Sequence, residues 1–454
     1  MNSTDALVDF TLAEQVNVDG DALTFTLLDT LGVGLAGNIS PVVEVLRNWN
    51  ESHAMPGSAR VWGTALQCDA ARAALLNGTA AHALDFDDAS PSMPMHASAV
   101  VWPALLAVAD ERGSSLNDLY QAATIGQTVF RAIAEALPMS SHYPRGWHST
   151  ATIGRIAGTL AVARLVGLSS AKTTHAIGIA ASMAAGSIAN FGTMTKPLHA
   201  GQAAQDAVLA VQLAEAGLTS NESQLDHSKG FFALFGDPER DRSDLVARLK
   251  FWEENWTNDV SFKRYPSCYG THRAIDGMLK IRDQIGAGDE ITGIEVMVHL
   301  VGLEPLIAHF PKTGLEAKFN LAYTVGLAAI EGSVVLADFD GDWTCPDDVR
   351  KLMDVTTVTT APFPPDKPEI DGEPFSRVIV HTGSGNTFAE TVVFTRGDAR
   401  NPMSDEELLA KMVSCGMSGG FSRAGVDALG QAVLSLYPHG NISDVQQALK
   451  DVSA

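Results

Sequence analysis

The chain has 454 residues, of which 46% are hydrophobic, and it carries a formal net charge of −22. This length allows two or three domains, and the hydrophobic fraction supports a large core and argues against disorder. An excess of negative charge of this size repels nucleic acid and anionic membranes, so we expect neither as a partner.

Cysteine usage and the N-terminal residues predict a cytoplasmic protein. The cysteines at positions 68, 268, 345 and 415 lie far apart and form neither a CxxC pair nor a cysteine/histidine metal spacing. We therefore expect a reducing compartment and no disulfide framework. The first residues lack the basic and apolar regions of a secretion signal, and no apolar run reaches the ~18 residues of a membrane helix.

Residues 5–260 have the pattern of a mostly helical region. Their apolar stretches combine leucine with many alanines and glycines, which lets helices approach closely. The first helix is expected to close at Gly32 and Gly34. The predicted helices cover residues 21–34, 70–83, 99–109, 152–166, 170–189 and 203–216.

The pattern changes after about residue 265. Residues 291–300 alternate apolar and polar as a half-buried strand does, a helix is predicted over 317–330, and two strands at 377–381 and 387–395 flank a Gly-Ser-Gly-Asn turn. Residues 360–374 are predicted to be an exposed loop, and a capping box at 404–407 opens a further helix. We predict a mainly α protein, with an all-helical domain over 1–265 completed by helices in 403–454 and a smaller α+β lid domain over 266–402.

A cluster of carboxylates follows the predicted helix at 70–83. Asp85, Asp87 and Asp88 occupy four positions, and His96 comes eight residues after the last of them. Carboxylates close together near a core repel each other and lose hydration, so at least one pKa should shift, as in an acid/base site. The alternative is a helix-end cluster that caps a neighbouring helix or pairs with an arginine.

Two polar segments precede apolar helices. In SHYPRGWHS (141–149), Tyr143, Arg145 and His148 lie just before a helix whose first amides, with Arg145, would bind a carboxylate; the alternative is an N-cap at Ser149. In TKPLH (195–199), Lys196 stands in a first helical turn, where the macrodipole disfavours a cation. A lysine there indicates an anion site or a base of lowered pKa, or else is simply exposed.

A third polar segment, FKRYPSCYGTH (262–272), lies at the boundary between the two predicted domains, where ligand sites are common. It contains Lys263, Cys268 and His272. With no helix start or base beside it in sequence, Cys268 is interpreted as an inert small hydrophobe rather than a nucleophile. These segments supply cations and histidines but no phosphate loop and no metal-ligand cluster, which indicates cofactor-free proton transfer on a small polyanion.

Taken together, these segments resemble the MmgE/PrpD family, and the resemblance spans nearly the whole chain in the family's order. The residues that carry it are LNGTAAHALDFDD (76–88), GWHSTATIG (146–154), TKPLHAGQAAQDAVLA (195–210), KGFFALFGD (229–237), FKRYPSCYGTH (262–272), EAKFNLAY (316–323) and GDARNPMSDEEL (397–408). The family includes 2-methylcitrate dehydratase, cis-aconitate decarboxylase and iminodisuccinate epimerase. The resemblance implies a helical domain with an α+β lid, a site between them, a homodimer, and no metal or organic cofactor.

The resemblance also implies site residues. Asp85, His96, Tyr143, His148 and Lys196 are the catalytic candidates, and the spacing that leads to His96 is one residue longer than in the family. Arg145, His199, Lys263, Cys268 and His272 are the substrate-binding candidates. Two positions depart from the decarboxylase pattern, which has a threonine at Ala89 and a histidine at Cys268.

The expected chemistry is proton transfer at the carbon next to a carboxylate of a small di- or tricarboxylate. In this interpretation Lys196, with Arg145 or Lys263, stabilises the developing enediolate, His148 and Tyr143 carry protons, and Asp85 orients a histidine or protonates a leaving hydroxide. A hydro-lyase resembling 2-methylcitrate dehydratase is favoured. An epimerase of the iminodisuccinate type, a cis-aconitate-type decarboxylase and a catalytically idle polycarboxylate-binding protein are the alternatives.

Overall fold

A computed structural model describes residues 2–53, 55–137, 139–300, 302–370 and 372–452. The chain forms two compact units. The first comprises Met1–Asn190, Met194–Phe262 and Ser404–Ala454, and the second comprises Phe191–Thr193 and Lys263–Met403. The first is helical and the second combines helices with a sheet, so the predicted fold class, a large helical domain with a smaller α+β domain, is confirmed.

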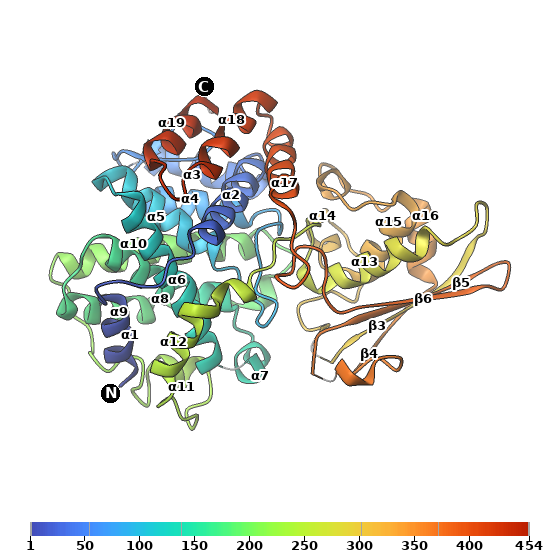
Figure 1. Ribbon diagram of the computed structural model, residues 1–454, viewed down its shortest axis with the longest axis horizontal. Coiled ribbons are helices and arrows are strands. Elements are labelled where there is room, and N and C mark those ends of the chain that lie inside the picture. The colour runs from blue at the N-terminus through green and yellow to red at the C-terminus, as the bar shows by residue number, and fades with distance from the viewer. Residues whose placement is uncertain (1, 54, 138, 301, 371, 453–454) are drawn as a thin grey trace. The chain divides into compact units, whose positions relative to one another are not determined.

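The first unit is built from layers of helices (Figure 1). Its C-terminal helices, drawn in red, pack beside α2, drawn in blue, so that sequence-distant ends of the chain share one core (Figure 1). The unit is not entirely helical, because the two-residue strands β1 and β2 pair antiparallel. The elements are α1 (Ser3–Thr11), α2 (Gly20–Gly37), α3 (Pro41–His53), β1 (Ala59–Arg60), β2 (Gln67–Cys68), α4 (Ala70–His82), α5 (Ser98–Arg112), α6 (Leu116–Ala136), α7 (Met139–His142), α8 (Ser149–Leu165), α9 (Ser170–Met183), α10 (Thr195–Glu215), α11 (Phe231–Phe235), α12 (Leu245–Asn255), α17 (Asp405–Ser418), α18 (Arg423–Leu434) and α19 (Ile442–Val452).

Several helix ends differ from the prediction. Helix α2 does not close at Gly32 and Gly34 but continues to Gly37. A Cβ on Gly32 would lie 3.0 Å from the backbone of Met412, and one on Gly34 would lie 2.8 Å from the Trp62 ring, so both glycines serve close packing. Helix α9 ends at Met183 instead of 189, and α10 begins at Thr195, eight residues before the predicted start. The polar TKPLH segment therefore forms the start of α10, in agreement with the predicted first-turn position of Lys196.

Helices α4 and α10 approach each other through two glycines. A Cβ on Gly78 would lie 3.0 Å from the Gly201 Cα, and a Cβ on Gly201 would lie 2.3 Å from the carbonyl oxygen of Leu75. No side chain other than hydrogen fits at that crossing without moving one helix. This contact sets the separation of the two helices, and each of them carries polar residues within two turns of it.

The second unit has a four-stranded mixed sheet of order β4-β3-β5-β6, in which β3 runs parallel to β4 and antiparallel to β5. The predicted hairpin at 377–395 is confirmed as β5 and β6, paired antiparallel. Helix α13 packs against both of these strands (Figure 1). The elements are α13 (Tyr269–Arg282), β3 (Ile291–His299), α14 (Gly314–Ala317), α15 (Leu321–Glu331), α16 (Asp347–Asp354), β4 (Thr356–Ala361), β5 (Ser376–Thr382) and β6 (Thr387–Val392).

Two predictions for this unit need correction. The helix predicted over 317–330 is present as α15 but starts at Leu321, because the Asn320 side chain caps it by accepting from the backbone N–H of Tyr323 at 2.9 Å, and Ala317 ends the short α14 instead. The start of the predicted loop at 360–374 belongs to β4, whose threonine-rich, mostly exposed sequence lacks the apolar alternation of a half-buried strand. The capping box at Ser404 is confirmed at the start of α17.

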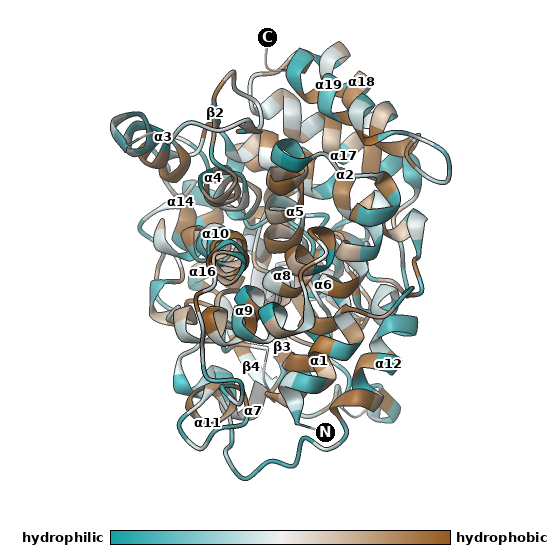
Figure 2. Ribbon diagram, turned by 90° about the vertical axis from the view of Figure 1, so that its left-hand side faces the viewer, coloured by the Kyte–Doolittle hydropathy of each residue, from teal (hydrophilic) through white to brown (hydrophobic). Residues whose placement is uncertain are grey.

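Hydropathy follows burial in the first unit. In Figure 2 much of α5 is white to brown, whereas the outer turns of α3 are teal. Among the described residues no single helix is both long and apolar enough to cross a membrane; only α2 and α3, taken together across a 79° bend, reach that length and composition.

A buried polar network ties α5 and α6 to the Asp cluster. The Asp88 carboxyl accepts a hydrogen bond from the Ser98 hydroxyl, which itself accepts one from the Gln127 amide at 2.9 Å. Arg131 continues the chain by donating to the Gln127 side chain at 2.8 Å and to Asp259 at 3.1 Å. Burial, reinforced by the charge of nearby Asp29, raises the pKa of Asp88 to about 7.

Substitution of Gly201 by alanine is expected to destabilise the first unit by about 1–3 kcal/mol or more, because the added methyl group collides with backbone of α4. Chemical denaturation followed by tryptophan fluorescence measures this change. Gln205→Ala, on the half-buried side of the same helix, is the matched control and is expected to leave the midpoint nearly unchanged. Equal midpoints for the two variants would contradict a steric limit at this crossing.

The Asp88→Asn variant is expected to gain stability over the wild type as pH rises. In the unfolded chain the Asp88 carboxyl has the ordinary aspartate pKa of 3.8, whereas in the folded protein its pKa is about 7, so the wild type loses stability between these values. Asparagine cannot ionise and keeps an oxygen for the Ser98 hydroxyl. Urea unfolding at pH 5 and pH 8 should show a difference between variant and wild type that grows with pH. Asp9→Asn, on the exposed side of α1, serves as control and should show no such growth.

Candidate functional site

Four histidines line up inside the first unit, one from each of four neighbouring segments. His82 ends α4, His96 precedes α5, His148 precedes α8 and His199 lies in the second turn of α10. The ring centroid of His82 lies 4.6 Å from that of His96 and 6.0 Å from that of His148, and the His148 and His199 centroids are 5.4 Å apart. The fold thus brings together three predicted site histidines and His82, which the sequence analysis did not select.

Lys196 and Asp85 form a buried ion pair beside these histidines. Lys196 is the second residue of α10, and Asp85 lies in the segment that follows α4. The Asp85 backbone has φ of 53°, the only positive value outside glycine among the described residues. Aspartate tolerates this left-handed region better than most residues but still at a cost, and such strain is common where a side chain is held for function. The pair confirms that Lys196 is not an exposed lysine.

His148 and His199 are in direct contact through their Nδ1 atoms, which are 3.1 Å apart. At this distance one Nδ1 carries the proton and the other accepts it. Burial, followed by the neighbouring His82 and Lys196 side chains, holds the pKa of His148 well below its usual range. Burial, with the nearby charges of Arg155 and Lys196, lowers the pKa of His199 to about 4. Both imidazoles are therefore neutral at pH 7, and the pair holds one shared hydrogen between them.

Asp87 is the carboxylate that anchors the other two histidines. Its Oδ2 lies 2.8 Å from the Nδ1 of His82 and 3.2 Å from the Nδ1 of His96. These two histidines hold the pKa of Asp87 well below its usual range although burial opposes them, so the carboxylate is ionised. Burial lowers the pKa of His82 to about 4.

The same three side chains are the group of described residues that could hold a metal ion, since their ligand atoms lie within 4.8 Å of one another. The His82 Nδ1 hydrogen-bonds to Asp87 Oδ2 at 2.8 Å, whereas the His96 Nδ1 hydrogen-bonds to the carbonyl oxygen of Asp88 at 2.8 Å and lies 3.2 Å from Asp87 Oδ2. We therefore interpret the trio as held by hydrogen bonds. The carboxylate with its two imidazoles then resembles the Asp–His pairs in which an acid orients a base.

Of the two candidate residues before α8, Tyr143 is buried and Arg145 is exposed. The Tyr143 side chain is buried, and its hydroxyl donates to the carbonyl oxygen of Pro94 at 3.1 Å, so it braces the loop that carries His96. The Ser149 hydroxyl donates to the same carbonyl. Arg145 ends a 3-10 turn and is exposed. Ser149 is not the N-cap that the alternative interpretation predicted, because it is the first residue of α8. The N-cap residue is His148, whose side chain makes no capping hydrogen bond.

Lys263, Cys268 and His272 belong to the second unit. Lys263 is fully buried, and the backbone N–H of Cys268 donates to the carbonyl oxygen of Lys318 at 2.9 Å. His272 is buried on α13, with Nε2 lying 3.1 Å from the carbonyl oxygen of Ser267. A helix does start beside Cys268, contrary to the sequence analysis: Cys268 is the N-cap residue of α13.

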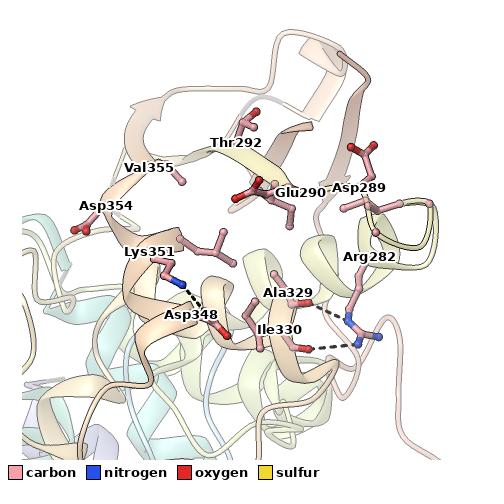
Figure 3. Close-up of a pocket in the computed structure, with 15 residues that line it drawn as sticks. Arg282, Asp289, Glu290, Thr292, Ala329, Ile330, Asp348, Lys351, Asp354 and Val355 are labelled. Atoms are coloured by element: carbon pink, nitrogen blue, oxygen red, sulfur yellow. Dashed lines mark hydrogen bonds and ion pairs between the residues drawn. The ribbon is translucent and has the colours of Figure 1, made fainter. Parts of the chain in front are cut away.

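The pocket of about 960 Å³ in Figure 3 also lies in the second unit and contains none of the predicted site residues. Its cations are already engaged. Lys351 pairs with Asp348 at 2.8 Å, and Arg282 donates to the carbonyl oxygens of Ala329 and Ile330 (Figure 3). Because carboxylates such as Asp289 and Asp354 also line it, the pocket is unsuited to a polyanion and we do not assign the chemistry to it.

The sequence analysis did not select His82 or Asp87 from the histidine cluster of the first unit, or the buried Lys318 of the second unit. His82 was hidden in an apolar alanine-rich helix, although its spacing of five residues to Asp87 across a helix end was a signal. Asp87 was seen only as part of an acid cluster. Lys318 is buried in the second unit and its ammonium donates to the carbonyl oxygen of Pro266 at 3.0 Å. Its signal was the EAKFNLAY segment, from which no residue was selected.

Comparisons with known proteins agree with this architecture. The MmgE/PrpD N-terminal domain matches residues 18–243, and the MmgE/PrpD C-terminal domain matches residues 265–431. The cis-aconitate decarboxylase of Homo sapiens is 28% identical over 395 residues, which cover 85% of this chain and 81% of the relative. The cis-aconitate decarboxylase of Aspergillus terreus (strain NIH 2624 / FGSC A1156) is 26% identical over 414 residues, covering 85% of this chain and 83% of the relative. With both domain models matched across most of its length, the chain belongs to the MmgE/PrpD family.

Proposed function

We propose that this protein is a cofactor-independent hydro-lyase of a small hydroxy di- or tricarboxylate, of the type of 2-methylcitrate dehydratase. The observation that carries the proposal is the set of neutral, buried histidines beside a buried Lys–Asp ion pair in the first unit. A neutral imidazole has a lone pair that can accept a proton from the substrate, and a buried ammonium can stabilise an anion, which are the two requirements of α-proton removal.

The His148–His199 pair supplies both an acid and a base. The imidazole that donates its Nδ1–H leaves its Nε2 lone pair as the base, and its partner has an Nε2–H that can serve as the acid. In the proposed reaction the base takes the α-proton, the C–H electron pair forms the C=C bond, and the C–O bond breaks as the acid protonates the departing hydroxide. Transfer of the shared hydrogen across the 3.1 Å contact then returns both rings to neutrality.

Lys196 stabilises the enediolate in this scheme, and Asp85 holds the ammonium in place. Arg145 and Lys263 remain proposed cations for the substrate carboxylates, with Cys268 and His272 as proposed binding residues. The His199 ring replaces Tyr143 as the favoured partner of His148, because the Tyr143 hydroxyl proton is engaged with Pro94.

Decarboxylation of cis-aconitate is the second candidate, and the relatives support it: five curated matches, 26–28% identical, are named as cis-aconitate decarboxylases or decarboxylase-like. That reaction needs an acid to protonate the carbanion but no base. The presence of Ala89 and Cys268 in place of threonine and histidine places it behind dehydration. An epimerase of the iminodisuccinate type would require two acid/base groups on opposite faces of the substrate.

The function is tested by proton NMR in D₂O with 2-methylcitrate, citrate, cis-aconitate, iminodisuccinate, and malate and tartrate stereoisomers. We expect deuterium at a carbon next to a carboxylate, with loss of water from a hydroxy acid. Loss of CO₂ from cis-aconitate alone would establish the second candidate, and exchange with inversion only would establish an epimerase. No exchange and no turnover, with tight binding of a polycarboxylate, would indicate the idle binding protein and overturn the proposal.

A double-mutant cycle separates the catalytic and structural roles of the buried pair. Lys196→Gln leaves the Asp85 carboxylate buried without its cation, so we expect a loss of about 3–5 kcal/mol of stability. Lys196→Gln with Asp85→Asn removes both charges and should recover most of that loss, since asparagine also tolerates a φ of 53°. Turnover should stay depressed by about 10²-fold or more in both variants. Recovery of turnover together with stability in the double variant would reduce the pair to a structural role.

A further inference from the structure

The buried carboxylate of Asp87 contacts two histidine rings, and neither contact has a role in the proposed reaction. It is completely buried, and its Oδ2 receives the Nδ1 atoms of both His82 and His96. The two histidines lie on either side of Asp87 in the sequence: His82 ends α4 five residues earlier, and His96 follows nine residues later. The Asp87 carboxylate thus orients the His82 ring, and it contacts the His96 ring, which the carbonyl oxygen of Asp88 also holds.

The contacts fix which nitrogen of each ring carries the hydrogen. The His96 Nδ1 also lies 2.8 Å from the carbonyl oxygen of Asp88, and a carbonyl oxygen can only accept. The His82 Nδ1 lies 2.8 Å from an ionised carboxylate, which likewise only accepts. The neutral His82 ring must therefore carry its hydrogen on Nδ1, which leaves its Nε2 as a lone-pair acceptor, and the His96 ring also carries a hydrogen on Nδ1.

The His82 Nε2 has no hydrogen-bond partner among the described residues, and the side chain has no exposed surface. A buried acceptor without a donor costs free energy, so such an atom in a native protein calls for a ligand or a water molecule. The His82 ring is flanked by the rings of His96 and His148, and the charge of Lys196 acts on it. The orphan acceptor therefore belongs to the same cluster as the proposed acid and base.

We propose that Asp87 is a positioning residue that holds His82 as the Nδ1–H tautomer, and that the His82 Nε2 accepts a hydrogen bond from the hydroxyl group of the bound polycarboxylate. A lone pair repels the oxygen of an ionised carboxylate and attracts an O–H donor. The site would therefore select hydroxy acids over otherwise identical acids that lack the hydroxyl group. The ligand half of this inference rests on the proposed function, whereas the tautomer half does not.

The tautomers are tested by long-range ¹H–¹⁵N NMR on protein labelled at histidine, which reports the protonated ring nitrogen directly. His82→Gln and His96→Gln assign the two rings by loss of their signals. We expect both rings as Nδ1–H in the wild type. In Asp87→Asn the ionised acceptor is gone, so His82 should shift toward the Nε2–H form, whereas His96 should keep Nδ1–H because the Asp88 carbonyl still accepts from it. An Nε2–H signal for His82 in the wild type would overturn the positioning role.

Hydroxyl selection is tested by calorimetric titration with citrate and with tricarballylate, which differs from citrate only by lacking the hydroxyl group. The wild type should bind citrate about tenfold more tightly, the value of one hydrogen bond. His82→Phe keeps a ring of similar shape without the acceptor, and its preference should fall to about one. An unchanged preference in His82→Phe would overturn the acceptor role. If neither acid binds the wild type, the polycarboxylate proposal fails and the ligand half fails with it, while the NMR result still decides the role of Asp87.

Discussion

The close contact of α4 and α10 at Gly78 and Gly201 holds the candidate site together. A methyl group at Gly201 would lie within 2.3 Å of backbone, so the helices can take this separation only with glycine at the crossing. His82 follows Gly78 by about one turn, and His199 and Lys196 precede Gly201 by less than two. Packing of small residues, which contribute no chemistry themselves, thus brings together the two helix ends that carry the polar groups.

Burial then decides the electrostatics of the cluster. Inside the first unit the ammonium of Lys196 is compensated by Asp85, and Asp87 stays ionised because two imidazoles donate to it. Loss of hydration keeps the neighbouring histidines neutral, with a pKa of about 4 for His82 and His199. A site of this kind offers neutral bases and one localised cation, which suits removal of a weakly acidic C–H proton better than binding of several carboxylates by charge alone.

The combination of neutral histidines with a buried ion pair is relevant to the choice among the reactions of the family. Dehydration needs an acid and a base in the same site, and in the proposed reaction the His148–His199 contact would provide both from one shared hydrogen. Decarboxylation, the activity named for the similar proteins of Homo sapiens and Aspergillus terreus, needs only the acid. The orphan Nε2 of His82 adds a preference for a ligand that has a hydroxyl group, and the hydro-lyase proposal predicts such a ligand.

Local patterns in the chain were enough to predict the fold class, several of the helices, the hairpin of the second unit and the family, because apolar periodicity, caps and motif spacing are properties of short segments. They also identified Asp85, His148 and Lys196 as polar residues misplaced in apolar surroundings. They did not predict that α2 continues through Gly32 and Gly34, since the reason for these glycines is close packing against Met412 and Trp62, which are distant in sequence. The places of His82 and Asp87 in the cluster, and of Tyr143 as a brace for a loop, became known only from the folded chain, because these roles depend on contacts between segments that sequence spacing does not encode.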